Sequence, residues 1–154
     1  MPSPMEYQVA VETVSEQLIA AARQRTTYKL VSKEIGALLS HPWAFIKTHP
    51  GIRNEGHNVA IYWDESGEGS IEVGVQVIST FAATDRVICS ATPAGTVART
   101  AHYGPYSELG KPHEAVRRWC REKGHPIVTP YWEIYGDWDD DPAKVRTDVL
   151  YLLK

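Results

Sequence analysis

The chain has 154 residues and a formal net charge of −3, without the excess of lysine and arginine that marks most nucleic-acid-binding domains. Its length fits a single domain, and no apolar run approaches the ~20 residues that cross a bilayer. Two isolated cysteines and the absence of a secretory leader pattern predict a cytoplasmic protein. We therefore expect no direct nucleic-acid binding and no membrane span.

The first half of the chain predicts a strand, a second strand, a helix and a hairpin of two strands. The ranges, in chain order, are 6–13, 16–27, 30–51, 58–64 and 70–78. The alanines of the second range also allow a helix. Pro42 falls inside the predicted helix and removes a backbone donor there. We expect a kink at Pro42, or one helix ending and another beginning.

The second half predicts the same order of elements. Its ranges are 86–91, 95–104, 105–124, 129–138 and 145–153. Gly124 stands where a left-handed C-terminal cap would end the helix. Pro112 is tolerated only in a first turn, so the regular part of this helix should begin near it.

The two halves are also alike in their letters, which indicates an internal duplication. Ile61-Tyr62 aligns with Ile134-Tyr135, and Ala60 aligns with Glu133. Such halves tend to pair about a pseudo-two-fold axis, and the groove at that axis is a natural pocket. The single domain and its two halves are predicted at 1–154, at about 5–80 and at 85–154.

The stretch Pro130–Trp138, PYWEIYGDW, carries one carboxylate among aromatic residues. Alternation along a strand turns Tyr131, Glu133 and Tyr135 to one face. A carboxylate between two rings suits a flat, apolar cation better than it suits a plain core. If Glu133 is buried, its pKa should rise unless a cation lies beside it.

Three other aromatic side chains are predicted to lie at this site, on weaker support. Tyr62 faces the axis from the other half, Trp43 lies on the first helix, and Tyr103 lies at a strand-to-helix corner. Tyr106 is expected to pack against the start of the second helix and not to contact ligand. The predicted ligand-binding residues are Glu133, Tyr135, Tyr62, Tyr131, Trp43 and Tyr103.

The ordered motifs of the second half resemble the gyrase-inhibitor-like (GyrI-like) small-molecule-binding domain family. That family includes the effector-binding domains of AraC-type and MerR-type multidrug-responsive regulators. Its pattern is His-x-Gly-Pro-Tyr, a helix with Leu and Trp ending in Gly, then Glu-x-Tyr and Thr-acid-aliphatic on the last strands. The matching residues here are His102, Gly104, Pro105, Tyr106, Leu109, Trp119, Gly124, Glu133, Tyr135, Thr147, Asp148 and Val149.

The resemblance implies an α+β fold in which duplicated strand–helix–strand–strand modules form one curved antiparallel sheet with two main helices. It also implies a central, aromatic-lined cleft that binds amphipathic, often cationic molecules, with Glu133 inside. Some family members are hydrolases that open cyclopropane rings with the glutamate and a nearby tyrosine. No helix-turn-helix precedes the first predicted strand, so a stand-alone member is expected.

Three functions remain open at this point. The leading hypothesis is a protein that binds a hydrophobic or cationic small molecule. The second is a hydrolase of reactive xenobiotics, with Glu133 and Tyr135 as catalytic residues. The third is a protein-interaction module that inhibits a topoisomerase. The sequence leaves both a monomer and a homodimer open.

Neither a cofactor nor a metal is expected. The six histidines do not form a His-x-x-x-His pair with a carboxylate, and the sequence contains no Cys-x-x-Cys.

Overall fold

The computed structural model describes residues 7–53, 56–63 and 68–154, with the side chains of 26–33 and 68–69 excepted. The first half contains β1 (Ala10–Val14), β2 (Gln17–Thr27), α1 (Tyr28–Thr48), β3 (Asn58–Tyr62) and β4 (Glu68–Gln76). The second half contains β5 (Ile88–Thr92), β6 (Gly95–Tyr103), α2 (Gly110–Lys123), β7 (Ile127–Tyr135) and β8 (Arg146–Leu153). Single 3₁₀ turns at Tyr106–Glu108 and Pro142–Lys144 precede α2 and β8.

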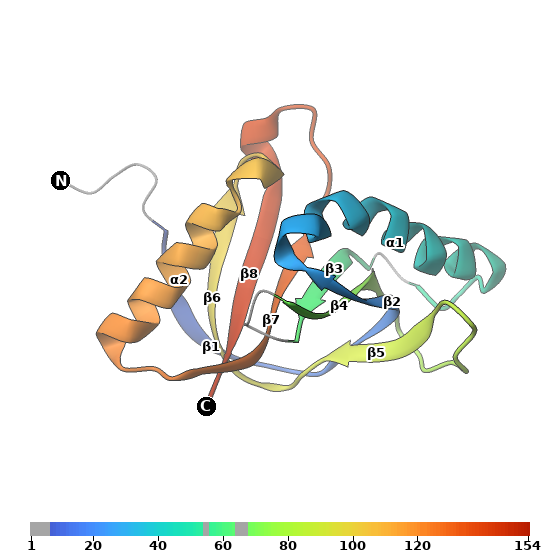
Figure 1. Ribbon diagram of the computed structural model, residues 1–154, viewed down its shortest axis with the longest axis horizontal. Coiled ribbons are helices and arrows are strands. Elements are labelled where there is room, and N and C mark those ends of the chain that lie inside the picture. The colour runs from blue at the N-terminus through green and yellow to red at the C-terminus, as the bar shows by residue number, and fades with distance from the viewer. Residues whose placement is uncertain (1–6, 54–55, 64–67) are drawn as a thin grey trace.

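All eight strands form one antiparallel sheet in the order β1-β6-β8-β7-β3-β4-β2-β5. The order is symmetric about the β7–β3 pair, because β8 and β4, then β6 and β2, flank it on either side. The first strand of each half pairs with the second strand of the other half, β1 with β6 and β5 with β2. The α+β fold with two strand–helix–strand–strand modules is therefore as expected (Figure 1).

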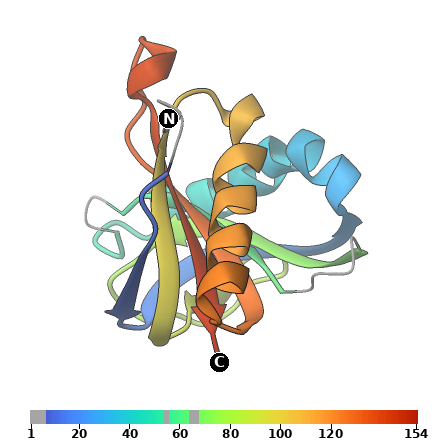
Figure 2. The same ribbon diagram turned by 90° about the vertical axis from the view of Figure 1, so that its left-hand side faces the viewer.

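Both helices cover the same face of this sheet. Helix α1 packs on β2 and β4, and α2 packs on β6 and β8, as the two views show (Figures 1 and 2). Leu38 of α1 and Val116 of α2 join one buried cluster with the strand residues that face them, such as Val73 and Val149. This face positions the candidate site, because the two helices flank the centre of the sheet.

In the described part of the chain, the opposite face of the sheet is buried without any helix. Its cluster contains strand residues only, including Ile19, Ile61, Trp132 and Leu150, each at most 1% exposed. The strand-only cluster gathers residues from β2, β3, β6, β7 and β8, so the sheet curves to cover this face with its own strands. Alternating residues on β7 divide between the two faces as predicted, with Tyr131 under the helices and Trp132 in the strand-only cluster.

Two local predictions change in detail. Residues on both sides of Pro42 belong to the single helix α1, so the second of the two expected outcomes, one helix ending and another beginning, is not observed. A proline removes only one intrahelical hydrogen bond, and buried Pro42 lies in the same helix as buried Leu38 and Phe45. The first strand begins at Ala10 and not at residue 6, a position that lies outside the described residues.

The second helix ends as its sequence predicts. Gly124 has φ 74° and ψ 30°, and its N–H lies within hydrogen-bonding range of the Arg121 and Cys120 carbonyls. Glycine adopts this left-handed conformation without steric cost. Pro112 occupies the first turn of α2, where a missing N–H breaks no intrahelical bond. In the part of the chain that the structure describes, neither helix is long and apolar enough to span a membrane.

Candidate functional site

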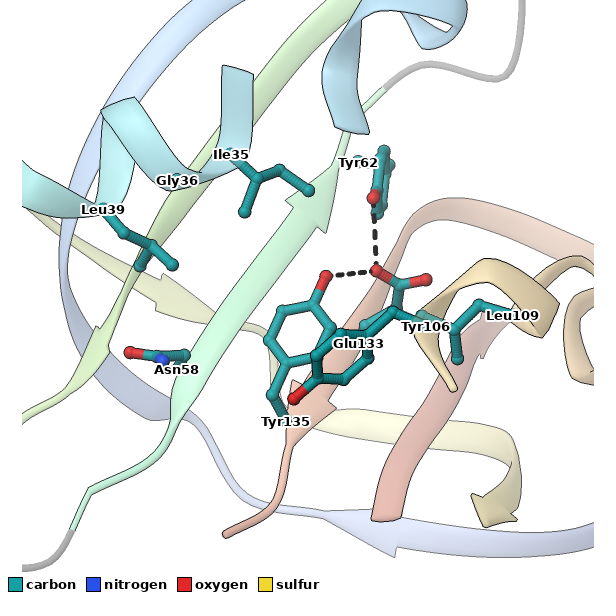
Figure 3. Close-up of a pocket in the computed structure, with 9 residues that line it drawn as sticks. All are labelled: Ile35, Gly36, Leu39, Asn58, Tyr62, Tyr106, Leu109, Glu133 and Tyr135. Atoms are coloured by element: carbon teal, nitrogen blue, oxygen red, sulfur yellow. Dashed lines mark hydrogen bonds between the residues drawn. The ribbon is translucent and has the colours of Figure 1, made fainter. Parts of the chain in front are cut away.

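A cavity of about 370 Å³ opens between the two helices over the central strand pair. Its volume lies within the range of small-molecule pockets. Figure 3 shows residues of α1 on one side, residues that precede α2 on the other, and β3 and β7 at the floor. The described lining residues are Ile35, Gly36, Leu39, Asn58, Tyr62, Tyr106, Leu109, Glu133 and Tyr135.

Glu133 lies at the middle of the central strand pair. It is directly opposite Ala60, the residue with which the sequence alignment of the two halves matches it. A pair of equivalent residues facing each other marks the position of a pseudo-two-fold axis. Because the equivalent position in the first half is an alanine, the two similar halves place one carboxylate, and not two, at this position. Glu133 is only 4% exposed.

Two tyrosine hydroxyls donate hydrogen bonds to the same oxygen of Glu133. Tyr135 Oη lies 2.5 Å and Tyr62 Oη 3.2 Å from Oε1 (Figure 3). Burial, followed by the negative charge of Glu133, raises the pKa of both tyrosines above the ordinary value of 10.0. Both hydroxyls therefore keep their protons near neutral pH and serve as donors.

A histidine occupies the other oxygen of the carboxylate. His113 Nε2 lies 2.7 Å from Glu133 Oε2, and His113 Nδ1 lies 2.7 Å from Tyr151 Oη. Arg117 Nε donates to the same Tyr151 oxygen at 3.1 Å. A chain of hydrogen bonds thus runs from the pocket carboxylate through two buried side chains to Arg117, which lies on the exposed side of α2.

These contacts decide the charge of Glu133. Burial by itself raises the pKa of the carboxyl, since a charged group is poorly solvated there. The hydrogen bond from His113, the positive charge of its protonated form, and the hydrogen bonds from Tyr135 and Tyr62 outweigh burial and lower the pKa below its ordinary value of 4.5. The site therefore holds a carboxylate anion at neutral pH.

Tyr131 contributes to packing under the site. Its ring is stacked between Tyr62 and Tyr151, with centroid distances of 4.9 and 4.8 Å. It is 7% exposed and lies outside the described lining of the cavity. The stack fixes the ring of Tyr62 and so directs its hydroxyl toward Glu133.

The remaining predicted residues divide between rim and surface. Trp43 donates from Nε1 to Asn58 Oδ1 at 2.9 Å, so it contacts a lining residue without being part of the described lining. Tyr103 is 58% exposed and stacks under the Arg146 guanidinium at 5.7 Å from the ring centroid. The structure does not bring Tyr103 into the cavity.

Tyr106 is placed differently from the sequence expectation. It lines the cavity, and its ring meets Tyr135 edge-on with the centroids 5.6 Å apart. It lies in the 3₁₀ turn that precedes α2, and that turn brings the ring over the strand. The sequence predicted only that it would pack against the start of the helix.

His113 is the main residue that sequence reasoning missed. It precedes Val116 by three residues and Cys120 by seven, so helical spacing already places it on the inner face of α2. It was weighed only as a metal ligand. No group of three or more histidine, cysteine, aspartate or glutamate side chains is arranged to hold a metal ion among the residues that the structure describes.

Solved structures share this fold. The C-terminal domain of EcmrR has a TM-score of 0.80 at 20% identity, covering 96% of this chain and 98% of that one. EcmrR in a DNA complex has a TM-score of 0.81 at 19% identity over 97% of this chain, which spans 58% of the length of the EcmrR chain. SAV2435 bound to tetraphenylphosphonium has a TM-score of 0.70 at 14% identity, covering 97% of this chain and 94% of that one.

Sequence comparisons add the family. No curated protein matches the chain. A family model, described as the GyrI-like small molecule binding domain, matches residues 7–154. This match covers nearly the whole chain, so the protein belongs to the GyrI-like small-molecule-binding domain family.

Proposed function

We propose that this protein binds amphipathic, aromatic cations in the cavity between α1 and α2, with Glu133 as the counter-charge. The observation that carries the proposal is a buried carboxylate, held in its charged form, at the floor of an otherwise uncharged cavity. Among the described lining residues, Glu133 alone has a formal charge. A cation that enters such a cavity loses its hydration, and the fixed negative charge compensates for that loss. A neutral ligand needs no such compensation.

The hydrogen bonds to Glu133 narrow the class of cation further. A carboxylate has about four acceptor positions, and Tyr62, Tyr135 and His113 occupy three of them. A ligand that requires several direct hydrogen bonds is therefore disfavoured. Quaternary and delocalised cations without N–H donors fit better, because they need charge and ring contacts alone. Cation–π contacts with the pocket tyrosines add roughly 0.5–2 kcal/mol each.

The comparison with SAV2435 supports this class of ligand. That protein, which has the same fold, binds tetraphenylphosphonium, a lipophilic cation with four phenyl groups and no hydrogen-bond donor. Apolar side chains of Ile35, Leu39 and Leu109 offer matching surface in the present cavity. A phosphonium ion is therefore the natural first probe.

The test compares methyltriphenylphosphonium with triphenylphosphine oxide, a neutral molecule of similar shape. We expect the wild-type protein to bind the phosphonium, and Glu133→Gln to lose about 2 kcal/mol of phosphonium binding free energy, roughly thirty-fold in Kd. The affinity for the phosphine oxide should change little. Glu114→Gln, which removes an exposed carboxylate on α2, is the matched control. Equal phosphonium affinity in wild type and Glu133→Gln would refute the proposal.

Hydrolysis is the second candidate function. It is favoured by the 2.5 Å contact between the Glu133 carboxylate and the Tyr135 hydroxyl, which places a base and a proton donor side by side in the cavity. The lowered pKa of Glu133 opposes a general-acid role and suits a base that orients water. Multiple turnovers of an electrophilic substrate, lost in both Glu133→Gln and Tyr135→Phe, would establish it. A single stoichiometric binding event without turnover would exclude it for that substrate.

A further inference from the structure

We propose that His113 sets the charge preference of the pocket, so that binding of a cation to Glu133 expels a proton from the protein. The inference rests on the proposed function and adds a regulator to the same site. A neutral imidazole leaves the negative charge of Glu133 to the ligand. An imidazolium 2.7 Å from the same carboxylate cancels that charge and repels a second cation.

The hydrogen-bond chain accommodates both states of His113 without rearrangement. The Glu133 carboxylate carries no hydrogen, so His113 Nε2 must donate to it in either state. In the neutral ring, Nδ1 accepts a hydrogen bond from the Tyr151 hydroxyl. In the imidazolium, Nδ1 donates to the same oxygen. Because a phenol both donates and accepts, Tyr151 allows His113 to gain or lose its proton in place.

The described groups that face His113, directly or through a hydrogen bond, come from β7, β8, α2 and β3. Glu133 on β7 contacts Nε2, and Tyr151 on β8, which contacts Nδ1, also accepts from Arg117 on α2. The Tyr131 ring of β7 meets the imidazole edge-on at 5.5 Å. On β3, Tyr62 acts through its bond to Glu133.

Two more elements approach this region. Strand β6, which also packs against α2, presents His102, whose ring nitrogens bond to the Tyr7 hydroxyl and the Pro105 carbonyl. From α1 the described cavity lining is uncharged, with Ile35, Gly36 and Leu39. The ligand cation therefore competes mainly with the proton on His113 for one carboxylate.

Because proton binding and cation binding are thermodynamically linked, the number of protons released sets how strongly the cation affinity depends on pH. If each bound cation releases one proton, affinity for the cation rises tenfold for each pH unit over which His113 is protonated in the free protein. Histidine side chains change their charge between about pH 5 and 8. A neutral ligand has no charge to compete with the proton, so its affinity should not vary with pH in this way.

The experiment is a calorimetric titration with methyltriphenylphosphonium at pH 5.5 and 8.0, each in two buffers that differ in ionisation enthalpy. For the wild-type protein we expect a weaker Kd at pH 5.5, by about five-fold or more, and release of up to one proton per cation there. Triphenylphosphine oxide should show neither effect. His113→Gln stays neutral and keeps a donor for Glu133, so its phosphonium affinity should be equal at both pH values. His125→Gln, on a partly buried histidine that stacks on Trp119, should behave as wild type.

The outcomes separate this inference from the proposed function. Phosphonium binding without proton release, and with equal affinity at both pH values, overturns the role of His113 and leaves the binding function intact. No phosphonium binding at either pH overturns both. Loss of the pH dependence in His125→Gln would assign it to another histidine and so refute the inference. If His113→Gln fails to fold, the absence of proton release from the wild-type protein would still overturn the inference.

Discussion

Glu72 and Glu133 are both buried carboxylates on strands near the centre of the sheet, but they lie on opposite faces of it. Glu72, fully buried on β4, accepts hydrogen bonds from Arg23 Nε at 2.8 Å and from Ser90 Oγ at 2.5 Å, and a second nitrogen of Arg23 also contacts it. Among the described residues, Glu133 accepts only from two tyrosines and a histidine. One carboxylate has a permanent cation as partner, and the other does not.

The difference shows why one buried acid is structural and the other is a candidate for function. Arginine remains protonated at any relevant pH, so the charge of Glu72 is always cancelled. The neutral hydroxyls on Glu133 stabilise its charge without removing it, and an imidazole, unlike a guanidinium, carries a charge only when it is protonated. Glu133 also faces a cavity, whereas Glu72 lies beside Ile61 of the strand-only cluster. Burial alone does not distinguish the two; the identity of the partners does.

Removing the permanent cation should have the largest effect on stability. Arg23→Met leaves Glu72 buried without its counter-charge, and breaking a buried pair in this way costs about 3–5 kcal/mol. Because the Arg23 side chain is 57% exposed, water replaces part of the loss, and we expect about 3 kcal/mol in urea unfolding. Arg25→Met on the same strand is the control. A difference below about 1 kcal/mol between the two variants would contradict the comparison.

Removing the hydroxyls around Glu133 should have intermediate effects. Hydrogen bonds to a charged group contribute about 1.5–3 kcal/mol, and Tyr135 lies closer to the carboxylate than Tyr62 does. We expect Tyr135→Phe to lower the free energy of unfolding by about 2 kcal/mol and Tyr62→Phe by about 1 kcal/mol. Tyr103→Phe, at an exposed ring, should change little. The reverse order for the two pocket tyrosines would show that the shorter contact is not the stronger one.

The smallest expected effect is the acid dependence of stability. The folded-state pKa of Glu133 is lowered from 4.5, so the unfolded chain takes up the proton first as pH falls. The contribution of the charged Glu133 to stability is fully present well above pH 4.5 and is lost as pH falls through the lower folded value. The stability difference between wild type and Glu133→Gln should therefore shrink between pH 6 and pH 3 in urea unfolding. A difference that grows on acidification would mean that burial, and not the hydrogen bonds, dominates.

Much of the fold follows from local pattern. The repeated order of elements, the hairpin of β3 and β4 and the left-handed cap at Gly124 were predicted, because periodicity and glycine act over a few neighbouring residues. Ala60 and Glu133, which the alignment of the two halves matches, pair across β3 and β7, but that pairing is a finding of the structure. At Pro42 the sequence left open a kinked helix or two helices, and the structure has the single helix α1.

The candidate site also combines features that local sequence pattern predicts with features that tertiary structure decides. Strand alternation alone placed Glu133 on one face with Tyr131 and Tyr135, because side chains of a strand turn to alternate sides whatever surrounds them. The tertiary structure decided that the helices cover this face. The contact with His113, the donor from Tyr62 and the ring of Tyr106 over the cavity were decided by tertiary structure. These partners come from α2, β3 and the turn before α2, and only the packing of helices on the sheet brings them to one carboxylate. The sequence determined that one acid shares a strand face with two tyrosines; its burial and the charge it keeps depend on neighbours distant in the chain.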